Sequence, residues 1–387
     1  MRLPLRSDLA IVGGGLAGGL TALALARRRP DLNIVLIEQA GQLGGNHVWS
    51  FFASDVEAED AALLAPLVAH RWEGHDVAFP TLRRTLAGGY RSITSARFDA
   101  VLREAIPAAR ILTGRGVAQV TAEAVALADG SVIAARAVID ARGAGDLGRL
   151  DCGWQKFVGQ TLRLEAPHGL ARPIIMDATV DQSEGYRFVY VLPVAADRLF
   201  VEDTYYSDTP ELDRDRLAGR IAAYAAARGW RVQAVEHEER GVLPVVMGGD
   251  FERYWRSTGD GIAKAGVRAG LFHPTTGYSL PDAVALARHV AALPDPAAPD
   301  LPAQLHAFAR ARWQSRGFYR MLDRMLFRAA PPADRWRVLE RFYRLDEGLV
   351  ARFYAARSTA FDRLRIVAGR PPVPILHAIP AIMGWRR

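Results

Sequence analysis

The chain is nearly free of cysteine and contains no long hydrophobic run. Cys152 is its only cysteine, which excludes an internal disulfide, and no cysteine and histidine cluster indicates a structural zinc site. No stretch of 18 apolar residues occurs, which argues against a membrane-spanning helix. The first strand pattern begins at Asp8, which leaves no room for a secretory signal ahead of it. We therefore expect a protein that stays in the reducing cytoplasm.

Lysine is absent from the last part of the chain, where arginine carries the positive charge. Residues 301–387 contain 17 Arg against 6 Asp plus Glu, although the whole chain has a net charge of only +7. Five of the arginines recur every fourth residue and predict a basic stripe along one amphipathic helix: Arg312, Arg316, Arg320, Arg324 and Arg328. The region lacks a recognised nucleic-acid-binding motif, so nucleic acid is not an expected partner.

The basic stripe, together with the apolar residues 373–385, predicts peripheral attachment to the anionic inner face of the cell membrane. The alternative is a solvated helix that packs on the protein core. Half of all residues are apolar and 9% are aromatic, which excludes wholesale disorder. The length of 387 residues allows two or three domains of about 100 to 200 residues each.

Residues 8–38 have the pattern of a β-strand, a glycine turn, a helix and a second strand that ends in an acid. Gly13, Gly15 and Gly18 form a GxGxxG turn. The first glycine permits the turn, the second lets a pyrophosphate approach the backbone, and the third lets helix and strand pack closely. Glu38 follows Gly18 by 20 positions and would accept hydrogen bonds from an adenosine ribose. The unit predicts a dinucleotide site.

Neighbouring residues extend this candidate cofactor site. Leu16 and Ala17 open the helix, whose free N–H groups face an anion, and Gln39 follows the ribose acid. A second glycine turn contains Gly45 and His47, and flavin enzymes commonly place such a turn here; a flexible surface loop is the alternative.

Two further residues are candidates for the same site. Arg97, in an expected helix over residues 95–104, could meet the pyrophosphate or could simply be exposed. Gly143 follows the apolar strand 137–141, where a returning strand is expected to pass the cofactor.

The middle of the chain has strand-like runs rich in aromatic and β-branched residues. They cover residues 160–164, 186–192 and 199–204 and predict a substrate-facing sheet, followed by a helix over residues 212–228. Residues 261–266 return to the pattern of the cofactor segment, and the last 85 residues are expected to be helical.

Four segments carry a resemblance to a known family: residues 8–18, 44–51, 200–206 and 268–281. On these segments the chain resembles the flavin-dependent lycopene cyclases of carotenoid synthesis, of the bacterial β-cyclase type. The first segment is shared with many flavoproteins, whereas the last two are specific. The resemblance covers nearly the whole chain.

The resemblance implies an α/β fold with an α+β substrate region, like p-hydroxybenzoate hydroxylase and geranylgeranyl reductase. A Rossmann-type FAD-binding domain would comprise residues 1–150 and 255–295. A β-rich substrate domain would comprise residues 151–254, and residues 296–387 would form a helical, arginine-rich region.

The resemblance also implies an isomerase that converts the ψ-ends of lycopene to β-rings, giving β-carotene through γ-carotene. FAD would be bound without a covalent link and be active when reduced, with NAD(P)H as the reductant. The family's catalytic acid falls on Glu202, with Asp203 beside it.

The chemistry expected of Glu202 agrees with its surroundings in the sequence. Ring closure needs a proton on the terminal double bond, and burial would keep a carboxylic acid protonated. Glu202 lies on an aromatic-rich strand beside Asp203, and because side chains alternate along a strand only one of the two can face the cavity. We assign the cavity to Glu202 and a supporting role to Asp203; the alternative is that both are exposed strand-end acids.

The segment 268–281 supplies the remaining cofactor candidates, which are Gly270, His273, Pro274, Thr276, Gly277 and Tyr278. His273 and Pro274 could press on the flavin or only turn the chain. Many flavoproteins have a Gly-Asp pair in this segment, where this chain has Ala269 and Gly270. Asp282 is expected to cap the helix that follows.

Two other classes of function remain open at this point. A redox flavoenzyme, either a monooxygenase or a prenyl reductase acting on a polyisoprenoid, can use the same fold. A non-catalytic lipid-binding protein is the third class, and a purified protein without flavin colour would favour it. Consumption of NAD(P)H in proportion to product would favour the redox enzyme over the isomerase.

Overall fold

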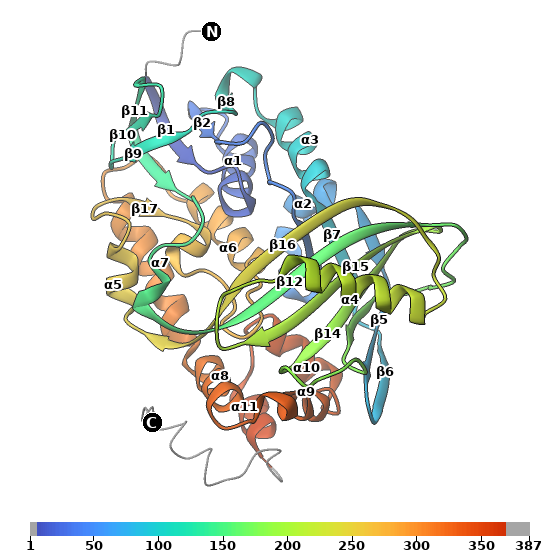
Figure 1. Cartoon of the computed structure of the whole chain (residues 1–387). Helices are drawn as coiled ribbons and strands as arrows, with labels where there is room; N and C mark the ends of the chain where they lie inside the picture. The colour runs from blue at the N-terminus through green and yellow to red at the C-terminus, as the bar shows by residue number, and fades with distance from the viewer. Residues whose placement is uncertain (1–5, 369–387) are drawn as a thin grey trace.

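The computed structural model describes residues 6–368 as two seven-stranded sheets, one three-stranded sheet and a helical C-terminal part. Figure 1 shows the first large sheet at the N-terminal end of the molecule and the second, longer sheet below and to its right. The predicted α/β architecture with a β-rich second region is confirmed.

The first sheet is built around parallel strands that are buried on both faces, as their continuous apolar sequence requires. Strand β1 lies between β2 and β11, and helix α1 packs against α6 on one face. The elements are β1 (Arg6–Val12), α1 (Leu16–Arg28), β2 (Ile34–Ile37), β8 (Ile111–Leu112), β9 (Val117–Val120), β10 (Ala124–Leu127), β11 (Val132–Asp140), β17 (Ala263–Lys264) and α6 (Leu280–Ala291).

The second sheet has long antiparallel strands in the order β16-β12-β15-β14-β13-β5-β6. Helix α4 covers one face, and the aromatic opposite face packs on the C-terminal helices. The elements are β5 (His75–Phe79), β6 (Leu82–Leu86), β12 (Leu150–Leu164), β13 (Ile174–Asp177), β14 (Arg187–Ala195), β15 (Arg198–Ser207), α4 (Arg214–Ala227) and β16 (Val232–Gly249).

Two features of this sheet differ from the sequence-based expectation. Strands β5 and β6 belong to it, although residues 1–150 were expected to form the cofactor unit; β5 joins by pairing in parallel with β13. Strand β16 was not predicted at all. Its middle, residues 236–240, is a run of charged residues and histidine that has no apolar alternation.

A third, small sheet connects the two large ones. It contains β3 (Val48–Phe52), β4 (His70–Trp72) and β7 (Tyr90–Thr94), with helices α2 (Ala58–Leu64) and α3 (Ser95–Ala105) beside it. Helix α3 agrees with the expected helix over residues 95–104, and α4 agrees with the one over residues 212–228.

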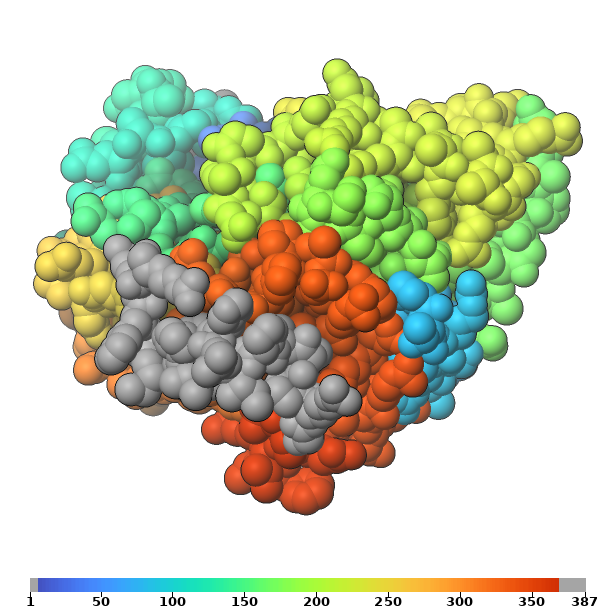
Figure 2. Space-filling model, turned by 60° about the horizontal axis from the view of Figure 1, so that its bottom comes forward, coloured from blue at the N-terminus to red at the C-terminus, as the bar shows by residue number. Residues whose placement is uncertain are grey.

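The C-terminal part is a layer of short helices over the aromatic face of the second sheet. Figure 2 shows these helices gathered on one side of the molecule, beside the β5–β6 hairpin. They are α8 (Gly317–Arg328), α9 (Arg335–Phe342), α10 (Glu347–Tyr354) and α11 (Ala360–Val367). Helices α5 (Phe251–Arg256) and α7 (Leu301–Ser315) pack instead in the core of the first sheet. None of the helices within residues 6–368 has the length and apolar character needed to cross a membrane.

The expected arginine stripe does not form a solvent-exposed helix face. Helix α7 ends at Ser315 and α8 begins at Gly317, so the stripe bends at Arg316. Arg316 is buried and donates to both carboxylate oxygens of Asp282, at 2.6 and 2.7 Å. The guanidinium of Arg320 lies 4.0 Å from the centre of a Trp313 ring.

The next two arginines of the stripe also bind the protein. Arg324 donates to the carbonyl of Met247, and Arg328 donates to Asp151 at 2.9 Å. The four-residue spacing therefore reports contacts to the protein rather than to a solvent face. Asp282 is in the first turn of α6 but makes no capping bond, since its carboxylate is bound to Arg316.

Candidate active site

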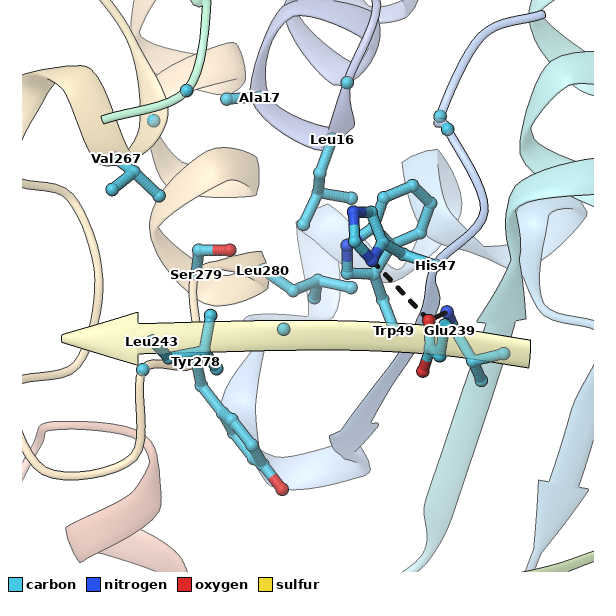
Figure 3. Close-up of a pocket in the computed structure, with 18 of the residues that line it drawn as sticks. Leu16, Ala17, His47, Trp49, Glu239, Leu243, Val267, Tyr278, Ser279 and Leu280 are labelled. Atoms are coloured by element: carbon cyan, nitrogen blue, oxygen red, sulfur yellow. Dashed lines mark hydrogen bonds and ion pairs between the residues drawn. The ribbon is translucent and has the colours of Figure 1, made fainter. Parts of the chain in front are cut away.

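A cavity of about 730 Å³ lies between the glycine turn of the first sheet and the aromatic face of the second sheet. Figure 3 shows its middle, with residues of the glycine turn, the second glycine turn, β16 and the start of α6 around one space. The cavity has two chemically different parts. One is lined by backbone and by polar groups of the first sheet, and the other by aromatic rings and carboxyl groups of the second.

The glycine turn forms the first part in the way the sequence predicts. Gly13 has φ +103°, a conformation that side chains disfavour, and a Cβ on Gly18 would lie 2.0 Å from the carbonyl oxygen of Gly13. Gly15 has the opposite property, because a Cβ there would meet no atom within 4 Å and would project into the cavity. Gly18 thus serves packing, while Gly15 leaves room for a bound group such as a pyrophosphate.

Glu38 is held at the end of β2 where a ribose acid belongs. Its carboxylate accepts hydrogen bonds from the backbone N–H groups of Gly14 at 2.7 Å and Ala40 at 2.8 Å. Gln39 lines the cavity beside it. The open Gly15, the helix start and this carboxylate fit an adenosine diphosphate group.

The other predicted cofactor residues divide into two groups. Those that line the cavity are Gly13, Gly15, Leu16, Ala17, Glu38, Gln39, Gly45, His47, Gly143, Thr276, Gly277 and Tyr278. Those that do not line it are Gly18, Arg97, Gly270, His273 and Pro274. Arg97 is exposed and donates to the carbonyl of Pro66 at 2.7 Å, so it turns away from the site.

His273 belongs to the protein core. Its Nε2 lies 3.0 Å from the carbonyl oxygen of Phe353, and its Nδ1 accepts the N–H of Thr275. Burial lowers the pKa of His273 to about 3, so the ring is neutral. In the same segment the cavity is lined by Gly266 and Val267 rather than by Ala269 and Gly270, where the sequence analysis placed the cofactor contact.

One row of the second sheet carries the chemistry of the other part. Tyr190 on β14 is opposite Glu202 on β15, Glu202 is opposite Gly159 on β12, and Gly159 is opposite Glu239 on β16. Residues in one row point to the same face of a sheet. Tyr190, Glu202 and Glu239 therefore all line the cavity.

Glu202 is the carboxyl group best suited to donate a proton. Its Oε1 accepts a hydrogen bond from the Thr204 hydroxyl at 2.6 Å, and no ion pair among residues 6–368 involves Glu202. Burial, followed by the nearby Glu239 carboxylate, raises the pKa of Glu202 to about 8. The group is therefore mainly protonated at neutral pH.

Asp203 does not support Glu202 on the cavity side. The alternation along β15 turns it to the opposite face, where Arg187 donates to its carboxylate at 3.0 and 2.6 Å. Arg220 of α4 lies 4.0 Å away. Sequence analysis predicted a supporting role for Asp203; the structure places its carboxylate on the face away from the cavity, in a buried ion pair with Arg187 that joins β15 to β14.

Hydrogen-bonded tyrosines surround the acid. The hydroxyl of Tyr190 donates to Tyr90 at 3.0 Å, and that of Tyr90 lies 3.4 Å from Tyr278. Tyr206 donates to Gln155 at 3.1 Å. Desolvation raises the pKa of all four tyrosines well above the ordinary value, so they stay neutral. Their ring faces can stabilise a cation without offering a strong nucleophile.

Sequence analysis missed several residues of the site: Tyr90, Arg142, Gln155, Tyr190, Glu239, Gly266 and Val267. Most of them come to the cavity through strand pairing between distant segments, which leaves no local pattern. The sequence held a weak signal for Val267, because it directly follows residues 261–266, which have the pattern of the cofactor segment.

Comparison with known proteins gives concordant findings. Residues 8–379 match the family model "Lycopene cyclase protein". The chain is 50% identical to the "Lycopene beta-cyclase" of Pantoea ananas, over 98% of this chain and 99% of that protein. It is 43% identical to the "Lycopene beta-cyclase" of Paracoccus sp., over 96% of each.

Two solved structures show the same fold. A geranylgeranyl bacteriochlorophyll reductase-like protein from Thermoplasma acidophilum superposes with a TM-score of 0.62 at 14% identity, covering 98% of this chain and 99% of that one. A probable FAD-dependent monooxygenase, pqsL from Pseudomonas aeruginosa, has a TM-score of 0.60 at 20% identity and covers 87% of this chain and 100% of its own.

The raised pKa of Glu202 predicts a specific pH dependence of stability. Below about pH 4.5 the group is protonated in both the folded and the unfolded chain; above that, only the unfolded chain ionises until the pH reaches about 8. Relative to Glu202→Gln, wild type should therefore lose up to about 1.4 kcal/mol of unfolding free energy per pH unit in this window. Denaturant unfolding at several pH values measures it, and the exposed Glu123→Gln variant is the control. A pH-independent difference for Glu202→Gln would contradict the assigned burial.

Proposed function

This chain belongs to the lycopene cyclase family, and we propose that it closes the ψ-ends of lycopene to β-rings by proton transfer from Glu202. Its function as a lycopene β-cyclase rests on identities of 43–50% to bacterial proteins of that name over nearly the full chain. One observation carries the mechanism. The carboxyl group of Glu202 is mainly protonated, has no ion-pair partner within residues 6–368, and lies in a cavity lined by aromatic rings.

The reaction is an acid-catalysed isomerisation. Glu202 donates its proton to the terminal double bond, the next double bond attacks the resulting cation, and a ring proton is then lost. Substrate and product have the same composition, so the reaction has no net redox change and the enzyme is an isomerase. Repetition at the second end converts the intermediate γ-carotene to β-carotene.

The chain's own groups favour this course. Water would capture the cation, and the rings of Tyr190, Phe157 and Phe188 supply apolar wall in the part of the cavity that holds Glu202. The ring faces beside Glu202 stabilise charge on the cation. The Thr204 hydroxyl orients the Glu202 carboxyl group through its 2.6 Å hydrogen bond.

FAD is the cofactor that fits the first part of the cavity. The glycine turn and the start of α1 would hold the pyrophosphate, and Glu38 the ribose. The second glycine turn, with His47 and Val48, and the segments 266–267 and 276–280 would hold the ring system. When bound in reduced form, FAD supplies electron-rich π density beside the cavity. NAD(P)H is proposed as the cellular reductant because it delivers the two electrons that FAD accepts.

We also propose that the protein attaches peripherally to the inner face of the cell membrane, where an apolar polyene would dissolve. With the arginine stripe turned inward, support comes from α11, where Phe361 is 72% and Leu364 is 63% exposed. Arg363 and Arg365 are exposed on the same helix. Residues 373–385, which were expected to contribute, lie outside the described residues.

The membrane proposal predicts that the protein floats with anionic vesicles and is released by salt. Each arginine near such a surface contributes about 1 kcal/mol. The double variant Phe361→Asp, Leu364→Asp should lose flotation, whereas Val132→Asp, an exposed apolar position of β11, should keep it. Equal binding to neutral vesicles, or no binding to either kind, would refute the electrostatic attachment.

The cofactor proposal predicts that Gly15→Val folds but does not hold FAD. The new side chain meets no protein atom and fills the space that the pyrophosphate needs. The visible spectrum of the purified variant measures flavin occupancy, and its thermal unfolding should match that of flavin-free wild type. Gly219→Val, at a helical glycine of α4 that is equally open, should keep its flavin. Full occupancy in Gly15→Val would overturn the phosphate-site assignment.

The acid assignment predicts that Glu202→Gln retains FAD and fold but loses cyclisation about 10²- to 10⁴-fold, because an amide has no acidic proton. Asp203→Asn should instead lower stability, since Arg187 loses its charged partner, while turnover of the folded enzyme stays near wild type. Lycopene consumption by reduced enzyme measures both variants.

The same assay in D₂O separates the isomerase from a redox enzyme. With a chemical reductant and no nicotinamide, each flavin should support many turnovers, and each ring should carry one deuterium at the carbon protonated by Glu202. Product that stops at one equivalent per flavin would establish the redox alternative. Near wild-type turnover of Glu202→Gln would show that another acid protonates the substrate.

A further inference from the structure

A second carboxyl group lines the cavity and has no role in the steps above. Glu239 on β16 is only 3% exposed. It lies in the same row as Glu202, because both residues are directly opposite Gly159, one on each side of β12. Two strand spacings, about 9.5 Å, separate their Cα atoms.

The two carboxyl groups have different partners. Oε2 of Glu239 accepts a hydrogen bond from the N–H of Val48 at 2.9 Å and lies 3.5 Å from Nδ1 of His47. Figure 3 shows both interactions as dashed lines, with His47 reaching from the second glycine turn toward β16. Glu239 thus has a backbone donor and an imidazole beside its Oε2 atom, whereas the side-chain hydrogen-bond partner of Glu202 within residues 6–368 is a hydroxyl. Different environments assign different roles to two acids in one site.

The two acids lie apart along one side of the cavity. Gly159 brings no side chain into the row, and the buried ring of Phe200 fills the place that a Cβ on Gly159 would take. The cavity beside this row is lined by the rings of Phe157 and Tyr190 and by Gly241, two residues beyond Glu239 on β16. A hydrocarbon ring in the cavity therefore has Glu202 toward one side and Glu239 toward the other.

The position of the base decides which product forms. Ring closure leaves the positive charge on a methyl-bearing carbon that has three kinds of neighbouring hydrogen. Loss of the proton from the ring carbon that carries the polyene gives the β-ring. Loss from the ring CH₂ gives the isomeric ε-ring, and loss from the methyl group gives an exocyclic double bond, the γ-ring.

We propose that Glu239 is the base that removes the proton from the polyene-bearing ring carbon and thereby restricts the product to β-rings. This inference rests on the proposed function. Glu202 transfers one proton to the terminal double bond, and a carbon–carbon bond closes the ring. The C–H bond then breaks toward Glu239, and its electron pair becomes the ring double bond. No electrons leave the substrate.

His47 lies beside the base, with its Nδ1 3.5 Å from Oε2 of Glu239. Glu239 returns the abstracted proton to solvent between turnovers. Glu202 regains a proton from solvent between turnovers, and the complete cycle therefore consumes none.

The test compares Glu239→Gln with Glu238→Gln in the full-length, FAD-loaded enzyme. Glu238 is the neighbouring residue on β16 and points to the other face, where it binds Arg214 and Gln160. Flavin occupancy, turnover of lycopene and the proportions of β-, ε- and γ-rings in the product are measured for both variants.

We expect Glu239→Gln to keep FAD, to lose about 10²- to 10⁴-fold in turnover and to form ε- or γ-rings beside β-rings. Glu238→Gln should form β-rings only, at the wild-type rate. Unchanged turnover of Glu239→Gln overturns the proposal. So does a slower variant that still forms only β-rings, because a structural or cofactor-holding role lowers the rate without redirecting the proton.

A conservative variant keeps the test decisive if Glu239→Gln does not bind FAD. Glu239→Asp retains the carboxylate but withdraws it by one methylene, so slower turnover with some ε- or γ-rings is expected. Wild-type rate and ring composition in Glu239→Asp would then refute the proposal. This outcome can be told apart from a wrong assignment of the acid. If Glu202 is not the acid, Glu202→Gln stays active, and that result does not depend on the Glu239 variants.

Discussion

The alternation of side chains along β15 is the constraint on which the site depends. Glu202 faces the cavity, so Asp203 must face α4, and each environment then fixes the state of its carboxyl group. Arg187 holds Asp203 as a buried ion pair, whereas Glu202 has no ion-pair partner within residues 6–368 and burial raises its pKa to about 8. A shift of β15 by one residue would exchange the two environments and remove the acid from the cavity.

The row of residues that contains Glu202 continues across the neighbouring strands of the second sheet. Strand pairing brings Tyr190 of the consecutive strand β14, and Glu239 of the more distant strand β16, into one row with Glu202 on one face. The wall therefore combines a protonated acid, a carboxylate and neutral phenol rings around one space. Such a wall suits a reaction in which a cation forms and disappears without water.

The C-terminal helices pack on the aromatic face of the second sheet, and arginines of these helices hold them in place. Arg316 reaches into the core to bind Asp282, and Arg324 binds the end of β16. Because a buried charge needs a partner, these contacts tie helix α8 to the first helix after the cofactor segment and to the second sheet. Among the C-terminal helices of the described chain, the exposed large apolar residues are Phe361, Leu364 and Val367 on α11.

The sequence by itself determined the parts whose signal is local. The glycines of residues 13–18 and the acid at 38 define a phosphate turn within one βαβ unit, and the motif around Glu202 indicated the family and a candidate acid. Alternation along a strand also predicted that Asp203 faces away from the cavity. Only the tertiary structure decided the rest: the ion pair of Asp203 with Arg187, the inward turn of Arg316 and Arg324, and the entry of Glu239 and β5 into the second sheet. Those features depend on strand register and helix packing between segments that are tens to hundreds of residues apart. The local sequence pattern of a strand does not specify which distant strand pairs with it.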